Sequence, residues 1–244
     1  MKVLLQIISL VFGLATFPLI NLNAGSIPEI LAKARPAVVQ IVAVDANQNP
    51  FKTGTGFFIS SDGVLLTSNQ VIVGAANLFA RTSTGAIYIF RGVVFRSSDL
   101  DLAVLKFAGR GVSYLELGSS ADAAEGQRVV VIGHPEGLDW TVTDGVISAF
   151  RDNRTSIEIT ALMSPGSSGS PVLDESGQVI GIATSVSKGG ERLNRAIAAE
   201  ALKRAFLAEP EQPADDESRE TNGTLKLRTA NPNEQPTDLS EFVQ

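Results

Sequence analysis

The amino-acid sequence predicts an all-β fold made of two small closed β-barrels, with a helix at the C-terminal end of the folded part. Between residues 27 and 208 the chain consists of many short β-rich runs, with little helical periodicity between them. Glycine, aspartate or asparagine punctuates most of the gaps between these runs. About a dozen strands over this length favour two barrels over a single sandwich.

Residues 1–24 have the pattern of a secretory signal peptide. Lys2 precedes an apolar run over residues 3–20, and small and polar residues follow before Gly25. The run is also long enough for a marginal membrane anchor, and residues 22–24 form a poor cleavage site. We therefore expect an extracytoplasmic protein, periplasmic or secreted, which contacts a membrane only if this segment is retained; the pattern favours cleavage over retention.

The folded part begins with a short helix predicted over residues 27–35, which Pro36 ends. Strands are predicted at residues 37–44, 54–60, 64–68, 77–81, 86–95, 103–107, 128–133, 140–150, 157–163, 172–173 and 178–184. Residues 198–208 predict a closing helix, because their apolar residues lie on one side. We expect residues 27–208 to form one folded domain, with barrel boundaries at about residues 27–115 and 116–198.

The charge of the chain is concentrated in its last segment. Residues 209–244 carry nine acidic and three basic residues, a net charge of −6, which equals the net charge of the whole chain. The rest of the chain is therefore balanced, and no basic field favours nucleic-acid binding. Few apolar residues and no sustained period predict that residues 209–244 form a disordered acidic tail.

Composition also excludes several kinds of chemistry. The chain has no cysteine, so disulfides, thiol catalysis and cysteine-based metal sites are excluded. No cluster of residues has the spacing of metal ligands, so neither a metal nor a cofactor is expected.

Residues 164–171, Ser-Pro-Gly-Ser-Ser-Gly-Ser-Pro, have the composition of a sharp loop that presents one hydroxyl group. Gly166 and Gly169 are free to adopt left-handed backbone angles on either side of Ser168. Prolines bound the turn at both ends. Such clusters are most often solvated turns, so this composition alone does not identify Ser168 as a nucleophile.

Three segments in order resemble the HtrA/Deg-type trypsin-like serine proteases. Residues 54–72 are similar to the family's catalytic histidine segment, residues 99–106 to its aspartate segment, and residues 164–171 to its nucleophile loop. Further similarity lies at residues 124–135, 142–148 and 194–204. The resemblance covers nearly all of residues 27–208 and is far more specific than a lone Gly-x-Ser-x-Gly.

The resemblance implies a fold, a site and an assembly. The fold would be two six-stranded antiparallel barrels with the active site in the cleft between them, and trimers are common in the family. Ser168 would be the nucleophile and Asp101 the catalytic carboxylate, with the backbone N–H groups of Gly166 and Ser168 as the oxyanion hole. By the same analogy a pocket for a small apolar residue would be lined by Leu162, Met163, Ile182, Ala183 and Thr184. We expect no PDZ domain, which is common in this family, after residue 208.

The sequence departs from the family at the catalytic histidine, because Gln70 occupies that position. A serine hydroxyl needs a base to remove its proton, and that base must then protonate the leaving amine. An amide does neither at neutral pH. Its carbonyl could still accept a hydrogen bond from Ser168 while its NH2 group donates to Asp101, as neutral imidazole would. The only histidine, His134, is interpreted as a turn residue in preference to a substitute base.

Two functional hypotheses follow. The first is an exported pseudoprotease that binds extended peptides or unfolded protein segments without cleaving them. The second is an active serine endopeptidase that cleaves such segments after small apolar residues, with help from His134, from a histidine in a substrate or partner, or from hydroxide. The substitution at position 70 favours the first.

Overall fold

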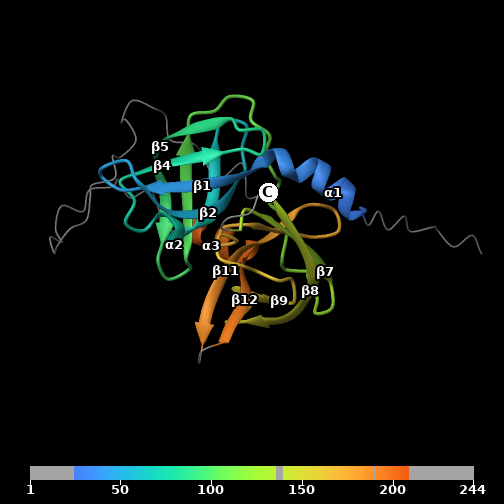
Figure 1. Ribbon diagram of the computed structural model, residues 1–244. Coiled ribbons are helices and arrows are strands. Elements are labelled where there is room, and N and C mark those ends of the chain that lie inside the picture. The colour runs from blue at the N-terminus through green and yellow to red at the C-terminus, as the bar shows by residue number, and fades with distance from the viewer. Residues whose placement is uncertain (1–24, 136–139, 189–190, 209–244) are drawn as a thin grey trace, which may run out of the picture.

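The computed structural model describes residues 25–135, 140–188 and 191–208, which form two closed antiparallel barrels (Figure 1). Barrel 1 has the strand order β1-β2-β3-β6-β5-β4, and barrel 2 has the order β10-β11-β12-β9-β8-β7. The predicted fold class of two six-stranded barrels with a C-terminal helix is confirmed. The predicted signal segment and acidic tail lie outside the described residues.

Each barrel is formed by six consecutive strands of the chain. Barrel 1 consists of β1 (Val38–Val44), β2 (Pro50–Phe58), β3 (Val64–Ser68), β4 (Asn77–Arg81), β5 (Ile87–Ser97) and β6 (Leu102–Phe107). Barrel 2 consists of β7 (Arg128–Gly133), β8 (Thr141–Arg151), β9 (Ser156–Ile159), β10 (Pro171–Leu173), β11 (Val179–Lys188) and β12 (Glu191–Ala198).

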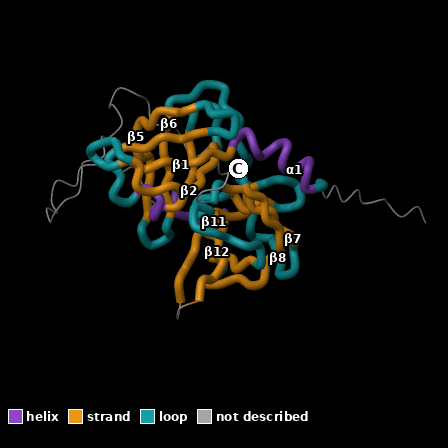
Figure 2. The backbone as a smooth tube through the Cα atoms, viewed as in Figure 1, coloured by secondary structure: helices purple, strands orange, loops and turns teal. Residues whose placement is uncertain are grey.

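Helices occupy little of the described chain, as Figure 2 shows. They are α1 (Ile27–Ala34), a 3-10 turn (Arg35–Ala37), α2 (Asn69–Ile72) and α3 (Ala199–Ala208). The Glu29 carboxylate accepts a hydrogen bond from the backbone N–H of Ser26, which caps the start of α1, and Pro36 follows its end. No helix within the described ranges is both long enough and apolar enough to span a membrane.

Strand β3 lies at the junction of the two barrels and is buried on both faces, which fixes the barrels against each other. All five residues of β3 are buried. Leu65 packs in the interior of barrel 1, whereas Val64 and Leu66 pack in the larger core that fills barrel 2 and the junction of the barrels. Protein interiors are close-packed and resist deformation. This junction is therefore a rigid support for side chains at the ends of β3 and β6.

The predicted elements differ from the structure in several places: β2 begins at Pro50 and not at residue 54, β11 continues to Lys188 and not to 184, and α2 is not among the predicted elements. The strand predicted over residues 157–163 ends at Ile159, because the Thr160 side chain accepts from the backbone N–H of Val146 and Leu162 turns into solvent. Strand β12 is also not among the predicted strands, because its sequence Glu-Arg-Leu-Asn-Arg-Ala-Ile-Ala shows no regular alternation of polar and apolar residues. It forms because it pairs with β11 from Gly181 to Lys188 and with β9 around Glu158.

Candidate functional site

The loop that carries Ser168 has the shape that its glycines predicted. Gly166 has φ +91° and Gly169 has φ +88°. A Cβ atom on Gly169 would lie 2.0 Å from the carbonyl oxygen of Thr55, so this position excludes any side chain. The chain is close here because Thr55 donates its backbone N–H to Ser168 O (3.0 Å) and Gly169 donates to Ala183 O (2.8 Å). The loop is thus tied to both barrels.

Thr55 is a buried polar residue that the sequence pattern did not single out. Its hydroxyl donates to Gly166 O (2.8 Å) and accepts from the backbone N–H of His134 (2.9 Å). The Thr67 hydroxyl in turn donates to Thr55 O (2.7 Å). A threonine between two glycines, directly before the apolar run at residues 57–59, was the available signal. Thr55 connects the Ser168 loop of barrel 2 to β2 of barrel 1.

Ser167 braces the loop from within. It is buried, its backbone N–H donates to Ser164 O (2.9 Å), and its hydroxyl accepts from the backbone N–H of Ser164 (3.2 Å). The two bonds close a tight turn around Pro165 and Gly166. The short hydroxyl of Ser167 therefore suffices to brace this turn.

Asp101 is held at the end of a turn by four hydrogen bonds to its carboxylate. Its backbone has φ +53°, an uncommon value for a residue with a side chain, although aspartate tolerates it better than most. Oδ2 accepts from Ser68 Oγ (2.5 Å), Thr184 Oγ1 (2.5 Å) and Gln70 Nε2 (3.0 Å), and Oδ1 accepts from the backbone N–H of Gln70 (2.7 Å). These donors come from both barrels, so the carboxylate joins them.

Gln70, in the short helix α2, lies between Asp101 and Ser168. Its Nε2 donates to Asp101 Oδ2 (3.0 Å) and to Ser168 Oγ (3.2 Å), and it lies 3.4 Å from Thr184 Oγ1. The expected bond from the amide to Asp101 is present. The expected bond from Ser168 to the amide carbonyl is replaced by its opposite, because the same NH2 group faces both partners.

The backbone N–H groups of Gly166 and Ser168 were predicted to form the oxyanion hole. Among the hydrogen bonds of the described residues, neither group donates to a protein acceptor. Both residues are only partly buried. The donors of an oxyanion hole must be unpaired before a ligand binds, and within the described chain these two N–H groups meet that condition.

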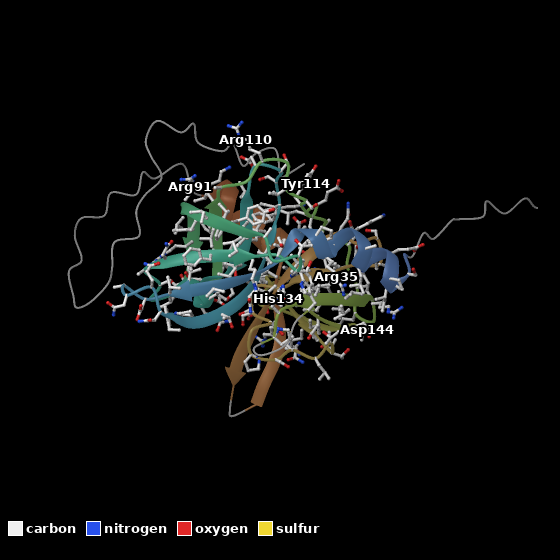
Figure 3. The ribbon with its side chains drawn as sticks, turned by 45° about the horizontal axis from the view of Figure 1, so that its top comes forward. Arg35, Arg91, Arg110, Tyr114, His134 and Asp144 are labelled. Atoms are coloured by element: carbon white, nitrogen blue, oxygen red, sulfur yellow. The ribbon has the colours of Figure 1, made fainter. Side chains whose placement is uncertain are left out.

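His134 lies near the middle of the molecule, where Figure 3 labels it. The residue is buried, and its ring packs edge-on against Trp140 with 4.4 Å between the ring centroids. The Arg35 guanidinium lies 5.6 Å from the Trp140 ring centroid on the side of α1. The rings of His134 and Trp140 thus form an aromatic contact in barrel 2, and the 3-10 turn that follows α1 lies beside it.

The five residues predicted to line a specificity pocket do not share one environment. Leu162 is 75% exposed, and Met163 packs against the larger core. Ile182 and Ala183 are buried within that core. Thr184 is hydrogen-bonded to Asp101. The structure therefore groups Thr184 with Asp101, Gln70 and Ser168, a role that the sequence pattern did not reveal, and the same holds for Ser68.

The comparison with protein families shows to which family this chain belongs. The model of the trypsin-like peptidase domain matches residues 54–182, which include Gln70, Asp101 and Ser168. The chain belongs to the trypsin-like peptidase family. Among its members, the relatives and solved structures that it resembles are of the HtrA type, as the sequence predicted.

Two relatives illustrate the similarity. A probable periplasmic serine endoprotease, DegP-like, from Chlamydia pneumoniae is 36% identical over 143 residues, which cover 56% of this chain and 29% of that protein. The chloroplastic protease Do-like 1 of Arabidopsis thaliana is 35% identical over 172 residues, covering 62% and 39% of the two chains. The chain thus spans roughly a third of the length of such HtrA-type relatives.

Solved structures extend the match to the fold. The serine endoprotease from Yersinia pestis superposes with a TM-score of 0.67 and 26% identity, covering 75% of this chain and 66% of that one. The HtrA-type protease AlgW, solved with a tripeptide, gives a TM-score of 0.66 and 29% identity, covering 75% and 63%.

Proposed function

We propose that this HtrA-type chain is a pseudoprotease, which binds extended polypeptide segments and does not turn them over. One observation carries the proposal: Gln70 Nε2 donates to Ser168 Oγ. In a working triad the residue at this position accepts the serine proton. Here the hydrogen bond runs in the opposite direction, and an amide nitrogen has no basic lone pair to receive that proton.

The cost of losing the base is large compared with the other differences at the site. In a serine protease, loss of the histidine alone lowers turnover about a million-fold, which is ~8 kcal/mol of barrier. An oxyanion hole and binding alone retain roughly a thousand-fold acceleration over water. The hydrogen bonds that Gln70 keeps preserve the shape of the site and contribute nothing to proton transfer.

The edge of β11 supports binding by strand addition. Strand β11 pairs with β10 only as far as Ile182, whereas it pairs with β12 as far as Lys188. Within the described chain, residues 184–188 therefore have a strand partner on one side only. This edge begins at Thr184, which is hydrogen-bonded to the site. An extended peptide that adds to such an edge gains backbone hydrogen bonds without needing a particular sequence.

We also infer that the protein works outside the cytoplasm. The support is the signal-like pattern of residues 1–24 and the word "periplasmic" in the names of several relatives. Fractionation with N-terminal sequencing tests this inference. Recovery of the protein from the cytoplasm with residues 1–24 intact would contradict it.

The experiment that tests the pseudoprotease proposal uses two substrates. A fluorophosphonate probe reports a nucleophilic serine, and a fluorescently labelled unfolded protein reports peptide hydrolysis. The unaltered protein is compared with Ser168→Ala, which lacks the hydroxyl, and with Gln70→His, which restores the family's base. We expect binding of the unfolded protein, negligible labelling and no cleavage by the unaltered chain.

Stoichiometric labelling of the unaltered chain that disappears in Ser168→Ala would refute the proposal. It would favour the alternative function, a serine endopeptidase that cleaves extended polypeptides after small apolar residues. Failure of the unaltered chain to bind any unfolded polypeptide would refute the binding role.

A further inference from the structure

We propose that the Ser168 site is a receptor for the free C-terminal carboxylate of a polypeptide. This inference rests on the proposed function and specifies the ligand class of the same site: the end of a chain is preferred over its interior. Three hydrogen-bond donors of one loop carry it: the backbone N–H groups of Gly166 and Ser168 and the Ser168 hydroxyl. Beside them lies the Gln70 amide, which donates a hydrogen bond to Ser168 and accepts none from it.

The first two donors are backbone groups. The N–H groups of Gly166 and Ser168 belong to the same tight turn, and within the described residues neither is used in a hydrogen bond. Both residues are partly accessible. Their orientation is fixed by bonds to neighbouring atoms, including Thr55 Oγ1 to Gly166 O and Thr55 N to Ser168 O. Such preorganised donors favour an anionic oxygen.

The third donor is the Ser168 hydroxyl, which the glutamine makes available. In a working triad the serine proton is directed at the base. Because Ser168 Oγ accepts from Gln70 Nε2, one of its lone pairs is occupied and its own proton is free to point elsewhere. The substitution at position 70 thus converts the hydroxyl from a donor toward the protein into a donor toward a ligand.

The amide of Gln70 is held in this orientation by Asp101. Rotation of the amide by 180° would place its carbonyl oxygen where Nε2 now lies, 3.0 Å from the carboxylate oxygen Oδ2. Two acceptors at that distance repel each other, whereas the NH2 group satisfies both Asp101 and Ser168. The reversed hydrogen bond is therefore a consequence of the fixed carboxylate.

The charges beside the site permit a bound carboxylate. Asp101 is negative, but its carboxylate is already engaged by four donors. The ammonium group of Lys52 donates to the backbone oxygen of Gln70 (2.8 Å), which places a positive charge next to that segment. The formal charges of Asp101 and Lys52 add to zero, so the positive charge of Lys52 offsets the repulsion between Asp101 and a bound carboxylate.

A carboxylate matches these donors better than an internal peptide group does. It offers two anionic oxygens, whereas an internal carbonyl offers one neutral oxygen to the same three donors. Hydrogen bonds to charged acceptors are about twice as strong as neutral ones. We therefore expect chain ends to bind roughly ten-fold more tightly than otherwise identical amidated ends.

The experiment is an NMR titration of the 15N-labelled chain with matched peptides. Acetyl-pentapeptides that end in alanine, valine or leucine are prepared as free acids and as C-terminal amides. We expect the acids to shift the amide resonances of Gly166 and Ser168 and to bind roughly ten-fold more tightly than the amides. Ser168→Ala should weaken acid binding about three- to ten-fold, and Lys52→Met about two- to five-fold in a salt-dependent manner.

Ser113→Ala is the matched control, because Ser113 is an exposed serine in the segment that connects the barrels, and it should change neither affinity. Equal affinities for acids and amides would overturn this inference while leaving peptide binding in place. The absence of shifts at Gly166 and Ser168 at millimolar acid would also overturn it. Cleavage of the peptides, measured by mass spectrometry of the titration mixture, would refute the proposed function itself, and this inference with it.

Discussion

The two barrels contribute to the candidate site in different ways, and the proposed loss of catalytic chemistry concerns only the contribution of barrel 1. Barrel 2 supplies the Ser168 loop, in which the proposed oxyanion donors, the backbone N–H groups of Gly166 and Ser168, donate to no acceptor of the described chain. Barrel 1 supplies Gln70 and Asp101, which form a hydrogen-bonded array in which the group that faces Ser168 is an amide and does not accept its proton. The shape of a hydrolytic site depends on backbone geometry, whereas its proton transfer depends on one side chain. One substitution therefore separates the two.

Gln70→His should produce the largest effect, because it restores the missing part on the barrel 1 side. We expect kcat/KM for a peptide ester or amide to rise by up to about a million-fold above the unaltered chain. Activity should increase as pH rises through about 6.5, since only neutral imidazole accepts the serine proton. The measurement is a pH–rate profile with an active-site titration.

The double variant Gln70→His/Ser168→Ala is the control for this gain and should be inactive. If Gln70→His is no faster than the unaltered chain while remaining folded, the Ser168 loop lacks a competent shape. That result would contradict the contrast between the two barrels.

Gly169→Ala should cause the largest loss of stability, since it disrupts the close contact between the Ser168 loop of barrel 2 and β2. The new Cβ atom would lie 2.0 Å from Thr55 O, which is backbone, and φ is +88°. Gly85 has the same φ of +88°, but a Cβ atom there would meet nothing within 4 Å. We expect Gly169→Ala to lower the free energy of unfolding by about 3–5 kcal/mol and Gly85→Ala by about 1–2 kcal/mol.

Urea denaturation of both glycine variants measures the difference, which isolates the steric clash from the shared backbone strain. Equal losses in the two variants would mean that the Ser168 loop can move away from β2. In that case the Ser168 loop would not hold its hydrogen-bond donors in a fixed geometry, as the proposed site requires.

Thr184→Val tests the hydrogen bond by which barrel 2 reaches the barrel 1 carboxylate. The hydroxyl donates to Asp101 Oδ2 at 2.5 Å, and valine has nearly the same shape without a donor. We expect a loss of about 1.5–3 kcal/mol in the free energy of unfolding, because the acceptor is charged. Thr143→Val is the control, since Thr143 donates to the neutral carbonyl of Leu162 at an exposed position. A loss in Thr143→Val as large as in Thr184→Val would contradict this role.

The sequence was sufficient for features that are local. The left-handed glycines at 166 and 169 could be predicted, because a tight turn around Ser168 requires them. The bounds of β3 and β7 could be predicted as well, since continuous apolar runs end at polar or glycine residues. The number of short strands already favoured two barrels, and the resemblance added six strands for each barrel and a site in the cleft between them.

Features that depend on distant contacts could not be predicted. Nothing within the strand that contains Thr184 shows that its hydroxyl faces Asp101 across the junction of the barrels. The direction of the Gln70 bond was also missed, since it depends on a carboxylate 31 residues away in the sequence. Strand β12 exists through pairing with β11 and β9, which its own residues do not reveal.

Glu158→Gln should give the smallest effect. It tests whether the ion pairs of Glu158 with Arg151 and Arg195 in barrel 2 influence the Ser168 site. Hydrogen bonds from Arg151 hold the pKa of Glu158 below its ordinary value against desolvation, and a bond from Arg195 adds to this. A lowered folded-state pKa means that the stabilisation is present above about pH 4.3 and is lost as pH falls through the folded-state pKa.

We therefore expect Glu158→Gln to lower the free energy of unfolding by about 1 kcal/mol between pH 5 and 8, and by progressively less below pH 4. Asp144→Asn removes the more exposed ion pair with Arg128 and should cost less than about 0.5 kcal/mol. Arg195 lies opposite Thr184 across the β11–β12 pairing. If Glu158→Gln also weakens acid-peptide binding, this ion-pair cluster orients Thr184, and the barrel 2 contribution extends beyond the Ser168 loop.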